Sequence, residues 1–256
     1  MRLSRDARNY LVYGIALFVV LEALLAAAIF WWPSFEENTG ALKLLAAPIP
    51  MLAEQLNLID AVGVPAYVVA QHFFKGCNTL GATAAVLLAM HAVAGEAQRG
   101  TMELWLSRPI SRRRLFTERY LGGLAAVVLP VFLTTFTIPM LLGLVDETMG
   151  LGNLTLCALH QSLFLAALYS ATMWLSAMGS QPLKIGFAML FLCIAEFAMY
   201  MVATLTDYSV FRWVDISSYA EILSAQSLNG PRTATLVAVN VLAYVGGVRA
   251  LERRVP

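Results

Sequence analysis

The sequence has 256 residues, of which 59% are hydrophobic and only 13% are charged, and its formal net charge is +1. A mean hydropathy of +0.71 excludes an ordinary water-soluble domain, because so few charged residues could not cover the surface around its core. The small net charge gives no indication of a nucleic-acid partner. Membrane lipid is therefore the expected surrounding of most of the chain.

Six apolar runs are long enough to cross the hydrocarbon core of a bilayer, which takes about 20 helical residues. Runs of this length are too long for barrel strands, and a backbone in lipid must satisfy its own hydrogen bonds. The sequence therefore predicts an all-α membrane protein. We expect a single transmembrane domain over 1–256, with spans at about 10–32, 66–93, 120–145, 154–178, 185–205 and 233–248.

Lysine and arginine are distributed unevenly around these spans. If the N-terminus is cytoplasmic, 13 of the 17 lie on the cytoplasmic side, three lie outside, and Lys75 falls within a span. Cytoplasmic loops of membrane proteins carry the excess of basic residues. We therefore expect a multi-pass protein of the cytoplasmic (inner) membrane with both termini in the cytoplasm.

Two external segments are long, at 33–65 and 206–232. The first carries apolar residues at spacings of three and four, which is typical of an amphipathic helix. These residues are Leu45, Ile49, Leu52, Leu56 and Ile59. Such a helix would either lie on the outer leaflet or pack on the helix bundle as a cap, and both interpretations stay open. The second segment mixes aromatic and acidic residues, a composition typical of the membrane interface.

The largest cytoplasmic loop, at 95–119, contains the most informative pattern. A short helix is expected to begin at Thr101, with Glu103 in its first turn, and to end before Pro109. A new helix is expected to begin at Ser111. A short, charged helix at the membrane face suits docking to a cytosolic protein, although a basic loop bound to anionic lipid headgroups is an equal alternative.

In this loop the chain resembles the ABC-2 permease family, whose second and third membrane helices are joined by a Glu, a Gly-Thr pair, a Leu-rich turn and a Pro-(Ile/Val)-Ser-Arg ending. The matching residues are Glu96, Gly100, Thr101, Leu104, Leu106, Pro109, Ile110, Ser111 and Arg112. Arg119 stands at the basic position that opens the third helix, whereas Trp105 departs from the usual Leu. The match in motif covers this loop, and the rest of the chain matches in architecture.

The resemblance implies an ABC-2 (type V exporter-like) architecture in which this loop is the coupling helix seated on an ATPase. It also implies a working unit of two permease copies, either a homodimer or a heterodimer, with two ATPase subunits. The sequence contains no GxxxxGK[ST] motif that could cradle ATP phosphates. We therefore expect no cofactor on this chain and no enzymatic activity of its own, with ATP and Mg²⁺ bound by the partner ATPase.

Three ionisable residues fall inside predicted spans, where each costs roughly 2.5–3.5 kcal/mol on insertion scales. Glu22, Lys75 and Glu196 lie nine or ten residues from the outer ends of their spans, at similar depths, so they can meet. A polar helix face is expected to join Lys75 with three further residues of its span, and Tyr200 follows Glu196 by one turn. The residues that would share the face with Lys75 are His72, Thr79 and Thr83.

In the resembled family the transport path runs between the second and fifth spans of two protomers, which would place this polar layer along the path. A structural ion pair that holds the spans together is the alternative. The three histidines lie on different helices or at different depths, and no HExxH motif is present, so no metal site is expected.

The sequence thus predicts the permease subunit of an ATP-driven transporter that exports or extrudes a substrate by alternating access. One alternative is an accessory permease that delivers a small sulfur or metal species, or mechanical force, to a maturation pathway. A second alternative, from another class of protein, is an intramembrane hydrolase that uses Glu and His side chains.

Overall fold

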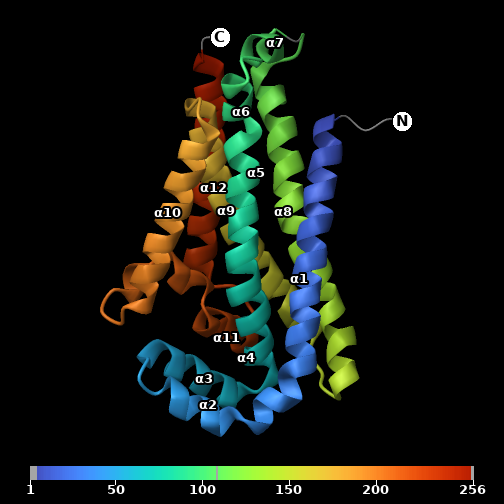
Figure 1. Cartoon of the computed structure of the whole chain (residues 1–256), viewed down its shortest axis with the longest axis vertical. Coiled ribbons are helices and arrows are strands. Elements are labelled where there is room, and N and C mark those ends of the chain that lie inside the picture. The colour runs from blue at the N-terminus through green and yellow to red at the C-terminus, as the bar shows by residue number, and fades with distance from the viewer. Residues whose placement is uncertain (1–4, 108, 255–256) are drawn as a thin grey trace.

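The computed structural model describes residues 5–107 and 109–254 of the chain. Its described part is an elongated bundle of long helices, with the start of α1 and the end of α12 toward the same end of the bundle (Figure 1). The short helix α7 lies at that same end, and α2, α3 and α11 lie at the opposite end (Figure 1). Arg2 and Arg108, which contribute to the predicted basic asymmetry, lie outside the described residues.

Helices make up the regular structure of the described residues. The long helices are α1 (Arg5–Glu37), α8 (Arg112–Leu142), α9 (Leu151–Met178), α10 (Pro182–Met201) and α12 (Gly230–Arg253). The shorter ones are α2 (Thr39–Ala46), α3 (Pro50–Val62), α4 (Val64–Val68), η1 (Val69–Gly81), α5 (Ala82–Ala92), α6 (Ala94–Gln98), α7 (Met102–Leu106), η2 (Gly143–Val145), η3 (Thr206–Tyr208), η4 (Val210–Val214) and α11 (Ile216–Ala225).

Within the described ranges, six helices are long and apolar enough to cross a membrane, which confirms the predicted all-α architecture of six spans. They are Ala7–Glu37, Val64–Ala92, Arg112–Val145, Leu151–Met178, Pro182–Met201 and Gly230–Arg253. The third begins eight residues earlier than predicted, because Ser111 caps it by accepting a hydrogen bond from the backbone N–H of Arg114. The start of α8 therefore extends beyond the apolar run into the cytoplasmic loop.

The second span is built from α4, η1 and α5, and its η1 portion is a π-helix. Its i→i+5 hydrogen bonds place more residues in each turn than an α-helix does, so residues three apart diverge around the axis. His72 is consequently buried, whereas Lys75 is exposed. The predicted single polar face, which assumed α-helical spacing, is wrong at His72 and holds for Lys75, Thr79 and Thr83.

The first external segment forms a helical hairpin rather than one continuous amphipathic helix. The extended backbone of Ile49 and the proline that follows it separate α2 from α3. Leu56 and Ile59 of α3 are buried against the bundle, whereas Leu45 is 77% exposed. The predicted stripe is therefore divided between a cap on the bundle and an uncovered tip.

The second external segment folds back into the bundle. Phe211 and Val214 of η4 and Tyr219 of α11 are buried, and Asp215 caps α11 by accepting a hydrogen bond from the N–H of Ser218 at 2.7 Å. Of the aromatic residues for which the composition predicted a membrane-interface placement, Tyr219 is buried in the core. Tyr208, by contrast, is 77% exposed.

Helix α9 lies at the centre of the bundle, in contact with α5, α8 and α12. Its Tyr169 is fully buried and lies directly against Gly123 of α8, where a Cβ would overlap the tyrosine hydroxyl. Small residues allow membrane helices to approach this closely.

We expect Gly123→Ala to lower the free energy of unfolding in detergent by about 1–3 kcal/mol, because the added methyl group overpacks this contact. Gly152→Ala is the matched control, since no atom lies within 4 Å of a Cβ built there. In α9 that change should be neutral or stabilising by about 0.5–1 kcal/mol. Equal effects of the two substitutions on thermal unfolding would contradict the packing described for α8 and α9.

Candidate functional site

The loop at 95–119, which was predicted to be cytoplasmic, folds into two short helices, α6 and α7, joined by a tight reversal. Gly100 adopts a left-handed conformation with φ of +69°, and the N–H of Thr101 bonds to the carbonyl oxygen of Glu96 at 3.0 Å. This is the arrangement in which a glycine ends a helix without the steric penalty of a Cβ. The predicted helix start at Thr101, end before Pro109 and restart at Ser111 are all present.

Glu96 is the anchor of this loop. Its side chain is 11% exposed and pairs with Arg119 at 2.6 Å and Arg99 at 3.0 Å, and it accepts a hydrogen bond from the Thr101 hydroxyl. Burial alone would raise the pKa of the Glu96 carboxyl. The hydrogen bonds from Thr101 and Arg119 and the two positive charges outweigh burial and lower that pKa below its usual value.

Arg119 connects three elements at one point. From α8 it pairs with Glu96 of α6, donates a hydrogen bond to the carbonyl oxygen of Ala92 at the end of α5, and lies over the ring of Trp105 of α7, 4.6 Å from its centroid. The Arg119 side chain is only 11% exposed. We call the group formed by Glu96, Trp105 and Arg119 the loop anchor.

Helix α7 has one buried and one exposed side. Met102 and Trp105 face the bundle, whereas Leu104 is 73% exposed and Glu103 is also exposed. Leu106 is half-buried, and the exposed Pro109 and Ser111 follow on the way to α8. An uncovered leucine at the end of a membrane protein is available to a partner in the water phase.

Arg112 has a different environment from the exposed loop residues. Its guanidinium donates hydrogen bonds to the carbonyl oxygens of Leu251, Glu252 and Arg254, at the C-terminal end of α12. A cation at this position satisfies carbonyl groups that lack partners within the helix. The structure therefore places Arg112 as a connection between α8 and α12.

The three ionisable residues inside the spans do not meet. Glu22 accepts a hydrogen bond from Thr137 of α8 at 2.9 Å, and Glu196 accepts one from the N–H of Val210 at 3.1 Å. Lys75 donates to the side-chain oxygen of Gln71 at 3.2 Å. Among the described residues of this chain the predicted Lys75 ion pair is absent, because the carboxylates face other helices.

The remaining residues of the predicted polar layer also separate. The Nε2 atom of His72 lies 3.1 Å from the hydroxyl of Thr134 inside the bundle. Tyr200 is buried and accepts a hydrogen bond from Gln55 of α3 at 3.3 Å, whereas Thr79 is exposed. Of the residues predicted to form the polar layer, Lys75 and Thr79 thus share the exposed side of the second span.

A buried amide network in the core was not predicted from the sequence. Gln161 of α9 donates to the side-chain oxygen of Asn78 in η1 at 2.8 Å and accepts a hydrogen bond from the hydroxyl of Tyr219 in α11. Asn78 in turn donates to the carbonyl oxygen of Val214 at 3.1 Å. The network joins the external segment to two spans. The amide side chains of Asn78 and Gln161, which stand inside apolar runs, were the sequence signal from which this network could have been predicted.

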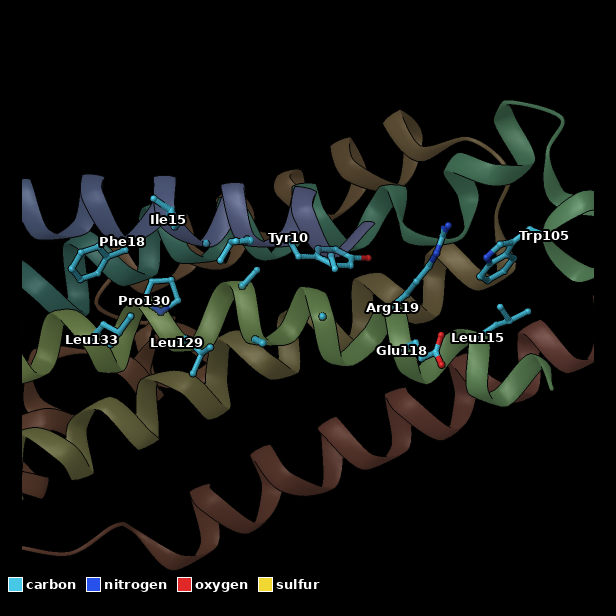
Figure 2. Close-up of a pocket in the computed structure, with 16 residues that line it drawn as sticks. Tyr10, Ile15, Phe18, Trp105, Leu115, Glu118, Arg119, Leu129, Pro130 and Leu133 are labelled. Carbon is cyan, nitrogen blue, oxygen red and sulfur yellow. The ribbon is translucent and has the colours of Figure 1, made fainter. Parts of the chain in front are cut away.

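Two hollows flank the N-terminal half of α1, each of about 650 Å³. One lies between α1 and α8, where Figure 2 shows Ile15 and Phe18 near Pro130, with Arg119 and Trp105 toward the α7 end. The other lies between α1 and α5. Tyr10 and Arg119 line both hollows, so the loop anchor borders each of them.

Comparison with known proteins gives one family match. Residues 2–249 match the family described as ABC-2 family transporter protein. No curated protein matches the sequence significantly.

Proposed function

The chain belongs to the ABC-2 transporter protein family and is a multi-pass permease subunit of an ABC transporter. We propose that it exports a substrate across the cytoplasmic membrane and that a separate ATPase chain drives this export. Two ATPase subunits would bind ATP and Mg²⁺, and a second permease copy would complete the path. The absence of a phosphate-binding motif from the 256 residues supports this division of labour.

The two-sided placement of α7 is the observation that carries the proposal. Leu104 and Glu103 are uncovered at the end of the bundle, while Trp105 on the other side is buried in the loop anchor. A partner bound to the exposed side would therefore move a helix that is rigidly attached to the membrane-spanning part. This is the mechanical requirement for coupling between two chains.

Movement of α7 would reach three spans through specific contacts. Arg119 carries it to α8 and, through the Ala92 carbonyl, to the end of the second span. Arg112 carries it from α8 to the end of α12. Displacement of these helices relative to α9 would open and close the path by alternating access.

The proposed orientation places α7 and both termini in the cytoplasm. The start of α1, the end of α12 and α7 lie toward the same end of the bundle (Figure 1). Most of the lysine and arginine residues also fall in segments at that end, as the rule for cytoplasmic loops requires.

We expect Leu104→Asp to abolish ATPase association, or to lower transport-coupled ATP hydrolysis at least tenfold, because a charge replaces the apolar contact at the centre of the docking surface. The permease would be co-expressed with its ATPase, and co-purification and ATP hydrolysis in proteoliposomes would be measured. Leu44→Asp is the control, since Leu44 is 79% exposed at the opposite end of the molecule. Normal association and coupling by Leu104→Asp would overturn the proposed docking surface.

A further inference from the structure

A polar row follows the uncovered side of the second span. Its positions repeat every four residues and carry four polar side chains, Lys75, Thr79, Thr83 and His91, with the apolar Leu87 between Thr83 and His91. Thr83 is half-buried and the other four are exposed. The hydroxyl of Thr83 and the Nδ1 atom of His91 each bond to the carbonyl oxygen four residues earlier, at 2.7 and 3.3 Å. The row therefore offers polar atoms from the cytoplasmic end of the span to its middle.

The hollow between α1 and α5 lies beside the cytoplasmic half of this row. Thr83, Leu87 and His91 form part of its wall, and Arg99 and Arg119 stand at its cytoplasmic end with Glu96. Most of its remaining wall is apolar, including Leu17, Val20, Leu80 and Leu88. A volume of about 650 Å³ is within the range of small-molecule sites. The hollow thus combines an apolar wall with a polar edge and an excess of positive charge.

Lys75 stands where the row reaches the middle of the membrane. It is the twelfth of the 29 residues of the span Val64–Ala92, so a bilayer centred on this span would place its ammonium group deep in the hydrocarbon layer. Within the described part of the chain its side chain bonds only to Gln71, an uncharged partner, and no carboxylate pairs with it. A charge at this depth is costly when it faces lipid tails, and such residues mark ligand paths.

We propose that this hollow and row take up an anionic lipid from the cytoplasmic leaflet as the substrate, with its tail against the apolar wall and its negative head group moving along the row to Lys75. The inference rests on the proposed transport function and specifies its substrate class. The positive charge of Lys75, left without a carboxylate by its own chain, selects a negative head group. The hollow opens beside α1, so a lipid could enter it from within the membrane.

Binding to the full-length permease in phosphatidylcholine nanodiscs tests this proposal without an ATPase. Spin-labelled phosphatidylglycerol and spin-labelled phosphatidylcholine of the same chain length would be compared by the fraction that the protein immobilises. We expect the wild type to prefer phosphatidylglycerol. Lys75→Met should lower that preference about tenfold, because a charge-assisted hydrogen bond is lost. Lys75→Arg should keep it.

Two further variants separate this site from general attraction of anionic lipid. Lys184→Met removes an exposed cation at the cytoplasmic end of α10 and should change the preference less than twofold. Thr83→Trp fills the hollow and should lower immobilisation of both lipids. Equal binding of the two lipids by the wild type, or an undiminished preference in Lys75→Met, would overturn the proposal. Because no ATPase is present, such a result would leave the outcome for Leu104→Asp unaffected.

Discussion

Arg119→Met should lower the free energy of unfolding in detergent by about 3 kcal/mol or more, because it leaves the Glu96 carboxylate buried beside a single, mostly exposed arginine. The double variant Arg119→Met with Glu96→Gln should recover part of this loss, since it removes the stranded charge. Chemical unfolding monitored by intrinsic tryptophan fluorescence would measure both changes in stability. Transport-coupled ATP hydrolysis should stay low in the double variant, because α7 is no longer attached to α8.

Arg114→Met is the matched control for this change. Arg114 also pairs with a glutamate, Glu118 at 2.9 Å, but both side chains are more than half exposed. Exposed pairs contribute about 0–1 kcal/mol. Equal losses in Arg114→Met and Arg119→Met would show that burial of the loop anchor has no energetic consequence.

The pH dependence of the loop anchor has a definite sign. The pKa of Glu96 is lowered by folding, so its contribution to stability is present above the unfolded pKa and is lost as the pH falls through the folded one. The stability difference between the wild type and Glu96→Gln should therefore be largest at neutral pH and should shrink in acid. A difference that grows on acidification would contradict the pairing.

Gln161→Leu should lower the free energy of unfolding by about 2–4 kcal/mol, because it strands the side-chain oxygen of Asn78 and the hydroxyl of Tyr219 in the core. The external segment should detach before the spans unfold, since this network holds α11 against them. A cysteine introduced at Ser218, which is buried in the wild type, should then react with an impermeant thiol reagent.

Gln181→Leu makes the same chemical change at an exposed position and serves as the control. It should change stability by less than about 0.5 kcal/mol. If both variants unfold alike and the cysteine introduced at position 218 stays protected from the thiol reagent in each, the amide network does not hold the segment 206–232.

Hydrophobic run length and local helix signals predicted the parts of the fold that depend on neighbouring residues. The six spans and the helix start at Ser111 follow from composition and capping, which the sequence displays directly. The π-helix did not follow, because the predicted polar face assumed α-helical spacing. Its effect was to turn His72 inward and to leave Lys75 outside. The positions of the helices along the chain were predictable, whereas the direction of each side chain around the helix axis was not.

The same distinction applies to the candidate site. Residue types in the loop indicated Glu96 and Arg119, but only the fold shows that they pair and that Trp105 completes the anchor. Arg112 was assigned to the coupling loop because it matches a motif in sequence, and its bonds to the end of α12 depend on residues about 140 positions away. Contacts of such sequence separation leave no local pattern.

Photo-crosslinking from position 104 in living cells would show whether α7 contacts an ATPase. A benzoylphenylalanine side chain would replace Leu104 in one sample and Leu44 in another, since both are exposed and they lie at opposite ends of the bundle. If an ATPase docks on α7, position 104 should crosslink to a chain that carries the GxxxxGK[ST] motif, and position 44 should not. An exclusive crosslink to lipid at position 104, with the permease still active in transport, would contradict it.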